Sequence, residues 1–153
     1  MIWNPHYEAM ERGQLTRIQG ERLCELVDRV YRRVPFYRQR MEQHGVRPSD
    51  IGSIADIGKL PFVTKDDMRE VYPFKLLAVD MDQIVEVHTS SGTTGQPVVD
   101  AYTRKDIDIW PESMARTLAM GDTAPGDIVH NAYGYGLFTG GLGVHYGARL
   151  VGA

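Results

Sequence analysis

The residues with the clearest chemical potential lie between Ser90 and Gly95, where four hydroxyl side chains and two glycines fall within six positions. Hydroxyls and backbone N–H groups both donate hydrogen bonds to an anion. Glycine lets such a loop turn its amides inward, because it adopts positive φ without a steric penalty. The segment is therefore typical of a loop that cradles phosphate groups. It is not a Walker A loop, because its glycines are spaced Gly-x-x-Gly and no Lys-Ser or Lys-Thr pair follows. A solvated Ser/Gly linker is the open alternative.

Aromatic residues and glycines form a second group of interest between Tyr133 and Gly147. The aromatic rings offer apolar walls that lose little rotamer entropy, and the glycines among them let the backbone turn tightly. This composition is typical of a pocket for a flat, apolar carboxylic acid. The predicted pocket residues are Tyr133, Tyr135, Gly136, Phe138 and Gly140. The alternative is that the aromatic side chains belong to an ordinary core.

Two predicted strands hold the first loop at its ends. Ile84, Val85 and Val87 precede the loop in an apolar strand-like run, and residues 98–102 follow it, so the sequence predicts a hairpin. Residues 103–106 then read as a capping box that opens a helix reaching about Met120.

The second group is predicted to follow a strand and open a helix. Residues 128–132 read as a buried strand, and a helix is expected from about Leu137. Gly140, Gly143 and Gly147 would form a smooth stripe on that helix, which favours close packing against a sheet.

The first half of the chain is predicted to be helical. Apolar spacing predicts a helix over residues 16–34, stopped by Pro35, and a shorter one over 37–43 that ends at Gly45. Thr64 is expected to cap a third helix that reaches about Tyr72. The predicted fold class is therefore α/β: a helical segment over residues 1–83, then the start of an incomplete α/β subdomain over residues 84–153.

Composition narrows the class of protein. The 153 residues carry a formal net charge of −3, which argues against a general nucleic-acid binder, and no run is long enough to predict a membrane span. The single cysteine suits a reducing compartment, and the first twelve residues do not read as a signal peptide, so we expect a cytoplasmic protein. None of the five histidines has metal-ligand spacing with another ligand, so no metal site is predicted.

The two groups together resemble a known family. Residues 89–97, Thr-Ser-Ser-Gly-Thr-Thr-Gly-Gln-Pro, are similar to the phosphate-binding motif of the acyl-adenylate-forming ligase superfamily. Residues 98–103 and the later run 133–141 resemble its phenylacetate–coenzyme A ligase branch. One difference is that many superfamily members have Lys after the proline of the motif, where this chain has Val98.

The resemblance implies an enzyme that joins phenylacetate to ATP with release of pyrophosphate and then transfers the acyl group to coenzyme A, with Mg²⁺ assisting. It implies that the phosphates are bound by Thr89, Ser90, Ser91, Gly92, Thr93, Thr94 and Gly95. The family's catalytic Lys, magnesium-binding Glu and ribose-binding Asp belong to later motifs. We therefore assign no catalytic residue here, and expect an N-terminal piece of a longer ligase that is inactive alone. Its N-terminal region helps to join subunits in the family, so a homodimer or other self-association is expected.

Two other functions remain open at this point. The same residues would serve a non-catalytic phosphate-binding or oligomerisation module. The spacing Gly134-x-Gly136-x-x-x-Gly140 also imitates the dinucleotide-binding fingerprint of an oxidoreductase, provided that it follows a strand and opens a helix.

Overall fold

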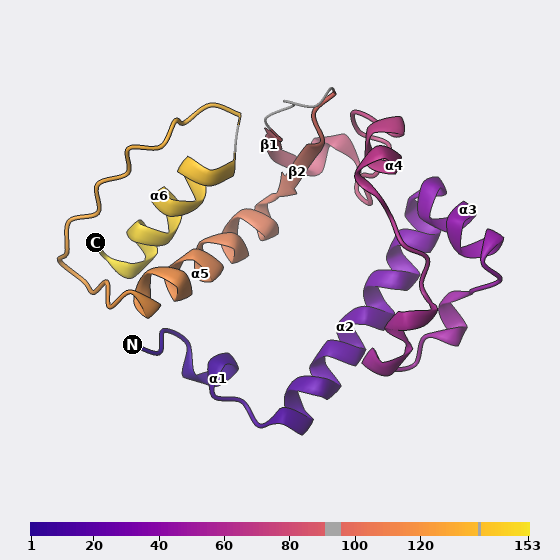
Figure 1. Ribbon diagram of the computed structural model, residues 1–153, viewed down its shortest axis with the longest axis horizontal. Coiled ribbons are helices and arrows are strands. Elements are labelled where there is room, and N and C mark those ends of the chain that lie inside the picture. Colours follow the sequence, from indigo (N-terminus) through magenta and orange to yellow (C-terminus); the bar gives the residue numbers. More distant parts are fainter. Residues whose placement is uncertain (91–95, 138) are drawn as a thin grey trace. The chain divides into compact units, whose positions relative to one another are not determined.

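The computed structural model describes residues 1–90, 96–137 and 139–153. The chain divides into two compact units, which we call the helical unit (residues 10–81) and the hairpin unit (residues 1–9 and 82–153). Figure 1 shows helices throughout and one short pair of strands, in agreement with the predicted α/β class. The predicted division at residue 83 remains a proposal. Over the described ranges, no helix combines the length and the apolar composition needed to cross a bilayer.

The helical unit contains three α-helices and two short 3₁₀ helices. These are α2 (Arg12–Arg33), α3 (Pro35–Gln43), η1 (Pro48–Asp50), η2 (Ile54–Lys59) and α4 (Lys65–Glu70). Pro35 separates the first two as predicted and is itself the first residue of α3, where its missing N–H costs nothing. Gly45 follows α3 with a φ of +66°, as the predicted left-handed cap requires. Helix α2 begins earlier than predicted, because the Glu11 side chain accepts the Gln14 N–H and caps it.

The core of the helical unit lies where α2 meets α3 and the following turns. Val27, Met41 and Ile51 are buried there, and Cys24 packs against them with its Sγ donating to the Ile51 carbonyl at 3.1 Å. Helix α4 begins with the predicted capping box: Thr64 Oγ1 accepts the Asp67 N–H, and the Asp67 carboxylate accepts the Thr64 N–H at 2.8 Å. Those bonds from Thr64 hold the pKa of Asp67 below its usual value, and Arg40 pairs with the same carboxylate.

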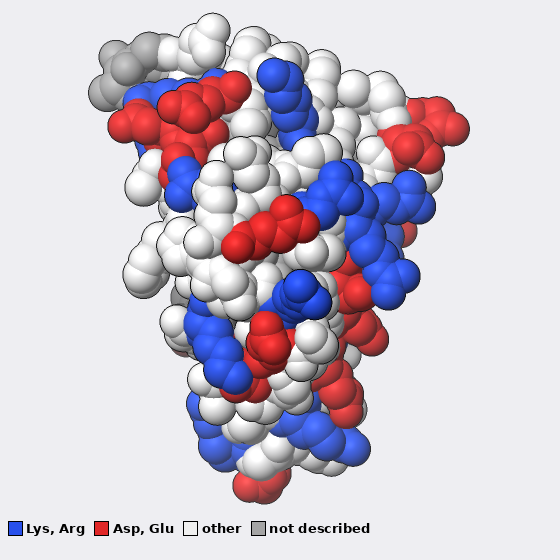
Figure 2. Space-filling view, turned by 90° about the vertical axis from the view of Figure 1, so that its right-hand side faces the viewer, with Lys and Arg blue, Asp and Glu red and all other residues white. Residues whose placement is uncertain are grey.

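Charged side chains of both signs are mixed on the face shown in Figure 2, which is turned towards the right in Figure 1. Within the helical unit, Arg32 pairs with Asp28 at 2.9 Å and Arg69 with Asp66 at 2.7 Å. This mixture is typical of a solvated surface.

The hairpin unit contains the short α1 (Pro5–Glu8), the antiparallel strands β1 (Ile84–Thr89) and β2 (Val99–Thr103), and the helices α5 (Arg104–Met120) and α6 (Thr139–Val151). A 3₁₀ turn, η3 (Met81–Gln83), comes immediately before β1. The predicted hairpin is confirmed. Thr103 closes the predicted capping box with Asp106 and so starts α5 directly at the end of β2.

The strand predicted over residues 128–132 does not form. These residues pair with no described strand, and the Ile128 side chain is 96% exposed. A strand needs a neighbour for its backbone N–H and C=O groups, and the described residues of the hairpin unit supply only β1 and β2, which pair with each other.

Glycines bring α6 close to α5, and the two helices run side by side in Figure 1. A Cβ built on Gly143 would lie 3.0 Å from Trp110 Cζ2, and one on Gly147 would lie 2.5 Å from Met114 Cγ. The predicted close approach is therefore present, but its partner is a helix and not a sheet. The sequence could not distinguish these partners, because a smooth helix face fits either.

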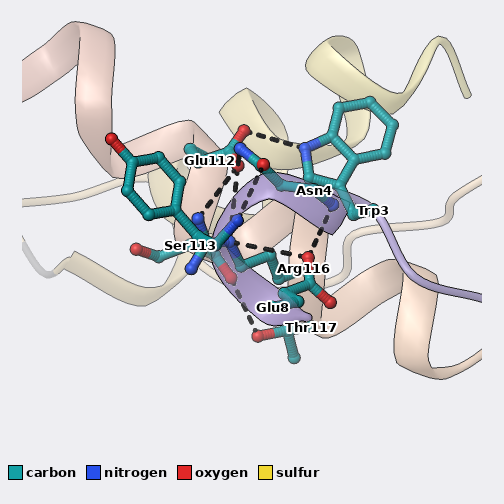
Figure 3. Close-up of polar contacts among 8 residues, drawn as sticks. Trp3, Asn4, Glu8, Glu112, Ser113, Arg116 and Thr117 are labelled. Atoms are coloured by element: carbon teal, nitrogen blue, oxygen red, sulfur yellow. Dashed lines mark hydrogen bonds and ion pairs between the residues drawn. The ribbon is translucent and has the colours of Figure 1, made fainter. Parts of the chain in front are cut away.

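Polar contacts, drawn in Figure 3, attach the first residues of the chain to α5. Trp3 Nε1 donates to Glu112 Oε2 at 2.8 Å, and Asn4 Nδ2 donates to Glu112 Oε1 at 2.6 Å. Arg116 lies 3.2 Å from Glu112 and 3.7 Å from Glu8. Burial alone would raise the pKa of Glu112, but the hydrogen bonds from Asn4, Trp3 and Arg116 together hold it below its usual value. These bonds explain why residues 1–9 belong to the hairpin unit.

Substitution of Gly147 by alanine tests the packing of α6 on α5. Alanine favours a helix by up to about 1 kcal/mol over glycine, whereas forcing a methyl group into a filled contact costs about 1–3 kcal/mol. We therefore expect Gly147→Ala to lower the free energy of unfolding, measured with urea. Gly136→Ala is the control in the same unit, because its added Cβ meets no atom within 4 Å. Equal stability of the two variants would contradict this packing.

Candidate phosphate and acid site

The open end of the hairpin carries the described part of the predicted phosphate loop. The Ser90 N–H donates to the Val98 carbonyl at 2.9 Å, and the Val98 N–H donates to Ser90 Oγ at 2.8 Å. These two bonds close the base of the intervening segment. Ser91, Gly92, Thr93, Thr94 and Gly95 lie outside the described residues, so the structure places only Thr89 and Ser90 of the predicted set.

A backbone hydrogen bond joins the two sequence motifs. The Thr89 N–H, at the end of β1, donates to the Leu137 carbonyl at 2.8 Å. Leu137 lies within residues 133–141, which we call the aromatic segment, and two residues before α6 begins at Thr139. Thr139 is also hydrogen-bonded to the Tyr102 side chain from β2. Both strands of the hairpin therefore contact this part of the chain, and Thr89 of the predicted phosphate set lies next to it.

The described residues of the predicted acid pocket lie at the surface. The Tyr133 and Tyr135 side chains are 58% and 52% exposed, so these rings are not part of a closed core. A Cβ added to Gly136 would meet no atom within 4 Å, and Gly140 is half-buried in the first turn of α6. Phe138 lies outside the described residues. The described members therefore form an open surface next to the hairpin.

Asn131, which the sequence analysis did not select, organises this surface. Its Nδ2 donates to the Gly141 carbonyl at 2.8 Å and to the Tyr135 hydroxyl at 3.1 Å, while its Oδ1 accepts the Tyr133 N–H at 3.2 Å. The amide thus fixes both tyrosines relative to α6. A lone asparagine in a predicted strand carries no sequence signal for such a role.

A hollow of about 190 Å³ lies beside Tyr135. Its other lining residues are Val129, Asn131, Val144, His145, Ala148, Arg149 and Ala153. Tyr135 is the one predicted acid-pocket residue, among those described, that lines it.

His88, one residue before the predicted phosphate loop, is a buried side chain of β1 and does not lie open to an anion. Its side chain is 1% exposed, its ring stands edge-on to Tyr102 and Trp110 at 5.0 and 5.2 Å, and its Nε2 lies 2.6 Å from Glu86 Oε1. Tyr102 and Trp110 stack at 5.4 Å. Trp110 therefore packs among the rings of its own unit.

Solved structures define the class of protein. The chain superposes with a TM-score of 0.90 and 31% identity on 2-hydroxyisobutyryl-coenzyme A ligase in complex with 2-HIB-AMP and coenzyme A, and the match covers 99% of this chain and 33% of that one. An open conformation of the same ligase gives a TM-score of 0.89 at 29% identity. The fold is that of a segment of an acyl-coenzyme A ligase.

Sequence relatives narrow the class. The chain is 47% identical over 152 residues to the phenylacetate–coenzyme A ligase of Thermus thermophilus and 46% identical over 156 residues to that of Escherichia coli. It spans 34% and 36% of the length of these relatives, while the matches cover 99% and 100% of this chain. No family model matches the chain. The resemblance to phenylacetate–coenzyme A ligases is therefore confirmed along its whole length.

The dinucleotide-binding alternative lacks the strand that its fingerprint requires among the described residues. Its fingerprint needs a strand directly before the glycine turn, and residues 127–132 pair with no described strand.

Removing the Ser90 hydroxyl tests the closure of the loop base. In Ser90→Ala the part-buried Val98 N–H loses its acceptor, and an unsatisfied buried donor costs about 1–3 kcal/mol. We expect a loss near the lower end of that range in urea unfolding, because water reaches this site. Ser90→Thr keeps the oxygen and should retain most of the stability. An alanine variant as stable as the parent would show that the bond does not close the loop.

Proposed function

We propose that this chain is the N-terminal part of an ATP-dependent phenylacetate–coenzyme A ligase. It binds the ATP phosphates and one side of the acid, and the remaining two thirds of the enzyme supply the other groups. The hydrogen bond from Thr89 to Leu137 supports the proposal, because it joins the first residue of the proposed phosphate loop to the aromatic segment. Adenylation requires the acid's carboxylate to meet the α-phosphate of ATP, so the residues that bind the two must be neighbours.

In this proposal the segment 90–95 binds the phosphates. Its four hydroxyls and its backbone N–H groups would donate to oxygens that gain negative charge as pyrophosphate leaves. The bonds between Ser90 and Val98 anchor the segment at its base, which limits the ordering entropy lost when phosphate binds. Val98 stands where many related ligases have a lysine, so the donors in this segment are neutral ones.

The aromatic segment would bind the acid. The exposed rings of Tyr133 and Tyr135 offer a flat apolar surface, and Asn131 fixes their backbone and hydroxyl positions. An aryl ring stacked there gains apolar burial and aromatic contact. Phenylacetate is our proposed substrate because the sequence relatives carry that substrate in their names.

The described residues do not fit a site for Mg²⁺. Among the described residues, no three His, Cys, Asp or Glu side chains stand close enough to hold a metal ion. We therefore route no step through a metal held by these residues, and Mg²⁺ would enter with ATP. Coenzyme A is proposed as the acyl acceptor from the relatives' names, with no residue of this chain assigned to it. The cytoplasmic location remains a prediction from the sequence.

Nucleotide binding tests the proposal. Isothermal titration of the chain with a non-hydrolysable ATP analogue should show one site, with no equivalent site for NAD. Thr93→Val combined with Thr94→Val removes two hydroxyl donors while keeping the shape of each side chain. This double variant should weaken binding at least about tenfold. The matched control is Thr117→Val, whose hydroxyl bonds the Ser113 carbonyl within α5. Unchanged affinity in the double variant would contradict the proposal.

Catalysis should separate from binding. Pyrophosphate exchange with phenylacetate should be absent from the 153-residue chain, because the resemblance assigns the catalytic lysine to a later motif. Exchange well above the no-enzyme rate would overturn this part of the proposal.

We also propose that the chain self-associates through the helical unit. An apolar hollow of about 230 Å³ there is lined by residues that include Leu26, Val30, Leu60, Pro61 and Val63. Phe62, between two of those residues, is 92% exposed. A second copy that covers these side chains would bury apolar surface that is otherwise in water.

Light scattering tests this association. Phe62→Ser should shift the chain towards the monomer by at least about tenfold in dissociation constant, since burying a Phe side chain contributes about 1.5–3 kcal/mol. Ile128→Ser is the control, because Ile128 is equally exposed, at 96%, but belongs to the hairpin unit. A monomeric parent chain, or an effect confined to Ile128→Ser, would contradict the proposal.

A further inference from the structure

Glu86 links β1 to α6 through both of its carboxylate oxygens. Oε1 lies 2.6 Å from His88 Nε2 on the same strand, and Oε2 accepts the Tyr146 hydroxyl of α6 at 3.1 Å. Glu86 and His88 are two positions apart on β1 and so project from the same face of the strand. The carboxylate therefore joins two side chains that belong to different elements.

Burial determines how the protons are arranged in this cluster. A carboxylate only accepts hydrogen bonds, so His88 Nε2 carries a hydrogen and donates it. His88 Nδ1 is buried with no hydrogen-bond partner among the described residues. Burial, and then the bond to Glu86, raise the pKa of Tyr146, so its hydroxyl keeps its proton and donates.

The cluster lies beside the contact that joins the predicted phosphate loop to the aromatic segment. Strand β1 ends at Thr89, whose N–H bonds the Leu137 carbonyl, and α6 begins two residues after Leu137. The side-chain bond between Glu86 and Tyr146 is thus a second attachment of β1, to α6 itself, beside the backbone bond to Leu137 just before that helix. Trp110, from α5, packs against both His88 and Tyr146 at 5.2 and 5.8 Å and fills the space around them.

We infer that Glu86 is a positioning residue which, through His88 and Tyr146, fixes the base of the phosphate loop relative to α6 and the aromatic segment. This inference rests on the proposed function for its consequence: nucleotide affinity depends on a hydroxyl of α6 that does not contact the nucleotide. Its structural content, the coupling of Tyr146 to the Thr89 N–H, does not need a ligand to be measured.

Amide hydrogen exchange of the full 153-residue chain tests the coupling. Tyr146→Phe removes one oxygen and keeps the ring, and should lower the protection of the Thr89 N–H by about tenfold, the typical effect of a hydrogen bond to a charged group. Glu86→Gln should do the same, because the amide replaces one of the two accepting oxygens with an NH₂ donor, and the two partners bond different oxygens of Glu86. Tyr31→Phe is the matched control, since it removes an equivalent bond, to Glu42 at 3.0 Å, within the helical unit.

The outcomes separate this inference from the proposed function. Loss of protection at Thr89 in both variants, with amides in the middle of α5 unchanged, supports it. Unchanged protection at Thr89, or an equal loss along α5, overturns it. If the parent chain binds the ATP analogue, Tyr146→Phe should also raise its dissociation constant by about fivefold or more. An unchanged constant in that variant would overturn the inference, whereas a parent chain without affinity would refute the proposed function and leave the exchange result to decide the inference.

Discussion

The close approach of α6 to α5 is the contact on which the hairpin unit depends. At Gly143 and Gly147, helix α6 has no room for a side chain of its own, because Trp110 and Met114 of α5 fill the space there. At this separation of the helices, Tyr146 of α6 reaches Glu86. Leu137, just before α6, reaches the Thr89 N–H with its carbonyl. A packing constraint between two helices thus determines the geometry of a site that lies at the end of a strand.

The proposed site combines the described start of the predicted phosphate loop with exposed aromatic side chains. Thr89 and Ser90 lie at the end of a two-stranded hairpin, and Asn131 fixes two exposed tyrosines, Tyr133 and Tyr135, in the segment that leads to Leu137. The described residues hold no metal-binding cluster. The chain spans about a third of the length of the ligases that it matches. Under the proposed function, these residues bind ATP and acid, and groups elsewhere in the enzyme act on them.

Local features of the fold could be predicted from the sequence, and long-range ones could not. Thr64 and Thr103 start their helices as predicted, because a capping box depends only on neighbouring residues. Residues 128–132 have the composition of a strand but no partner, and no local pattern reveals a missing partner. Glu86 was missed for the same reason, because its role comes from a contact with Tyr146, far away in the chain. Asn131 was missed because its partners are nearby residues of an irregular segment that was predicted to be a strand.

A crystal structure of the chain with a non-hydrolysable phenylacetyl-adenylate analogue tests the central claim most directly. We expect the phosphate-mimicking group to lie within hydrogen-bonding distance of residues 90–95 and the aryl ring to lie against Tyr133 and Tyr135. An analogue bound elsewhere, with residues 90–95 making no contact to it, would contradict the proposed function.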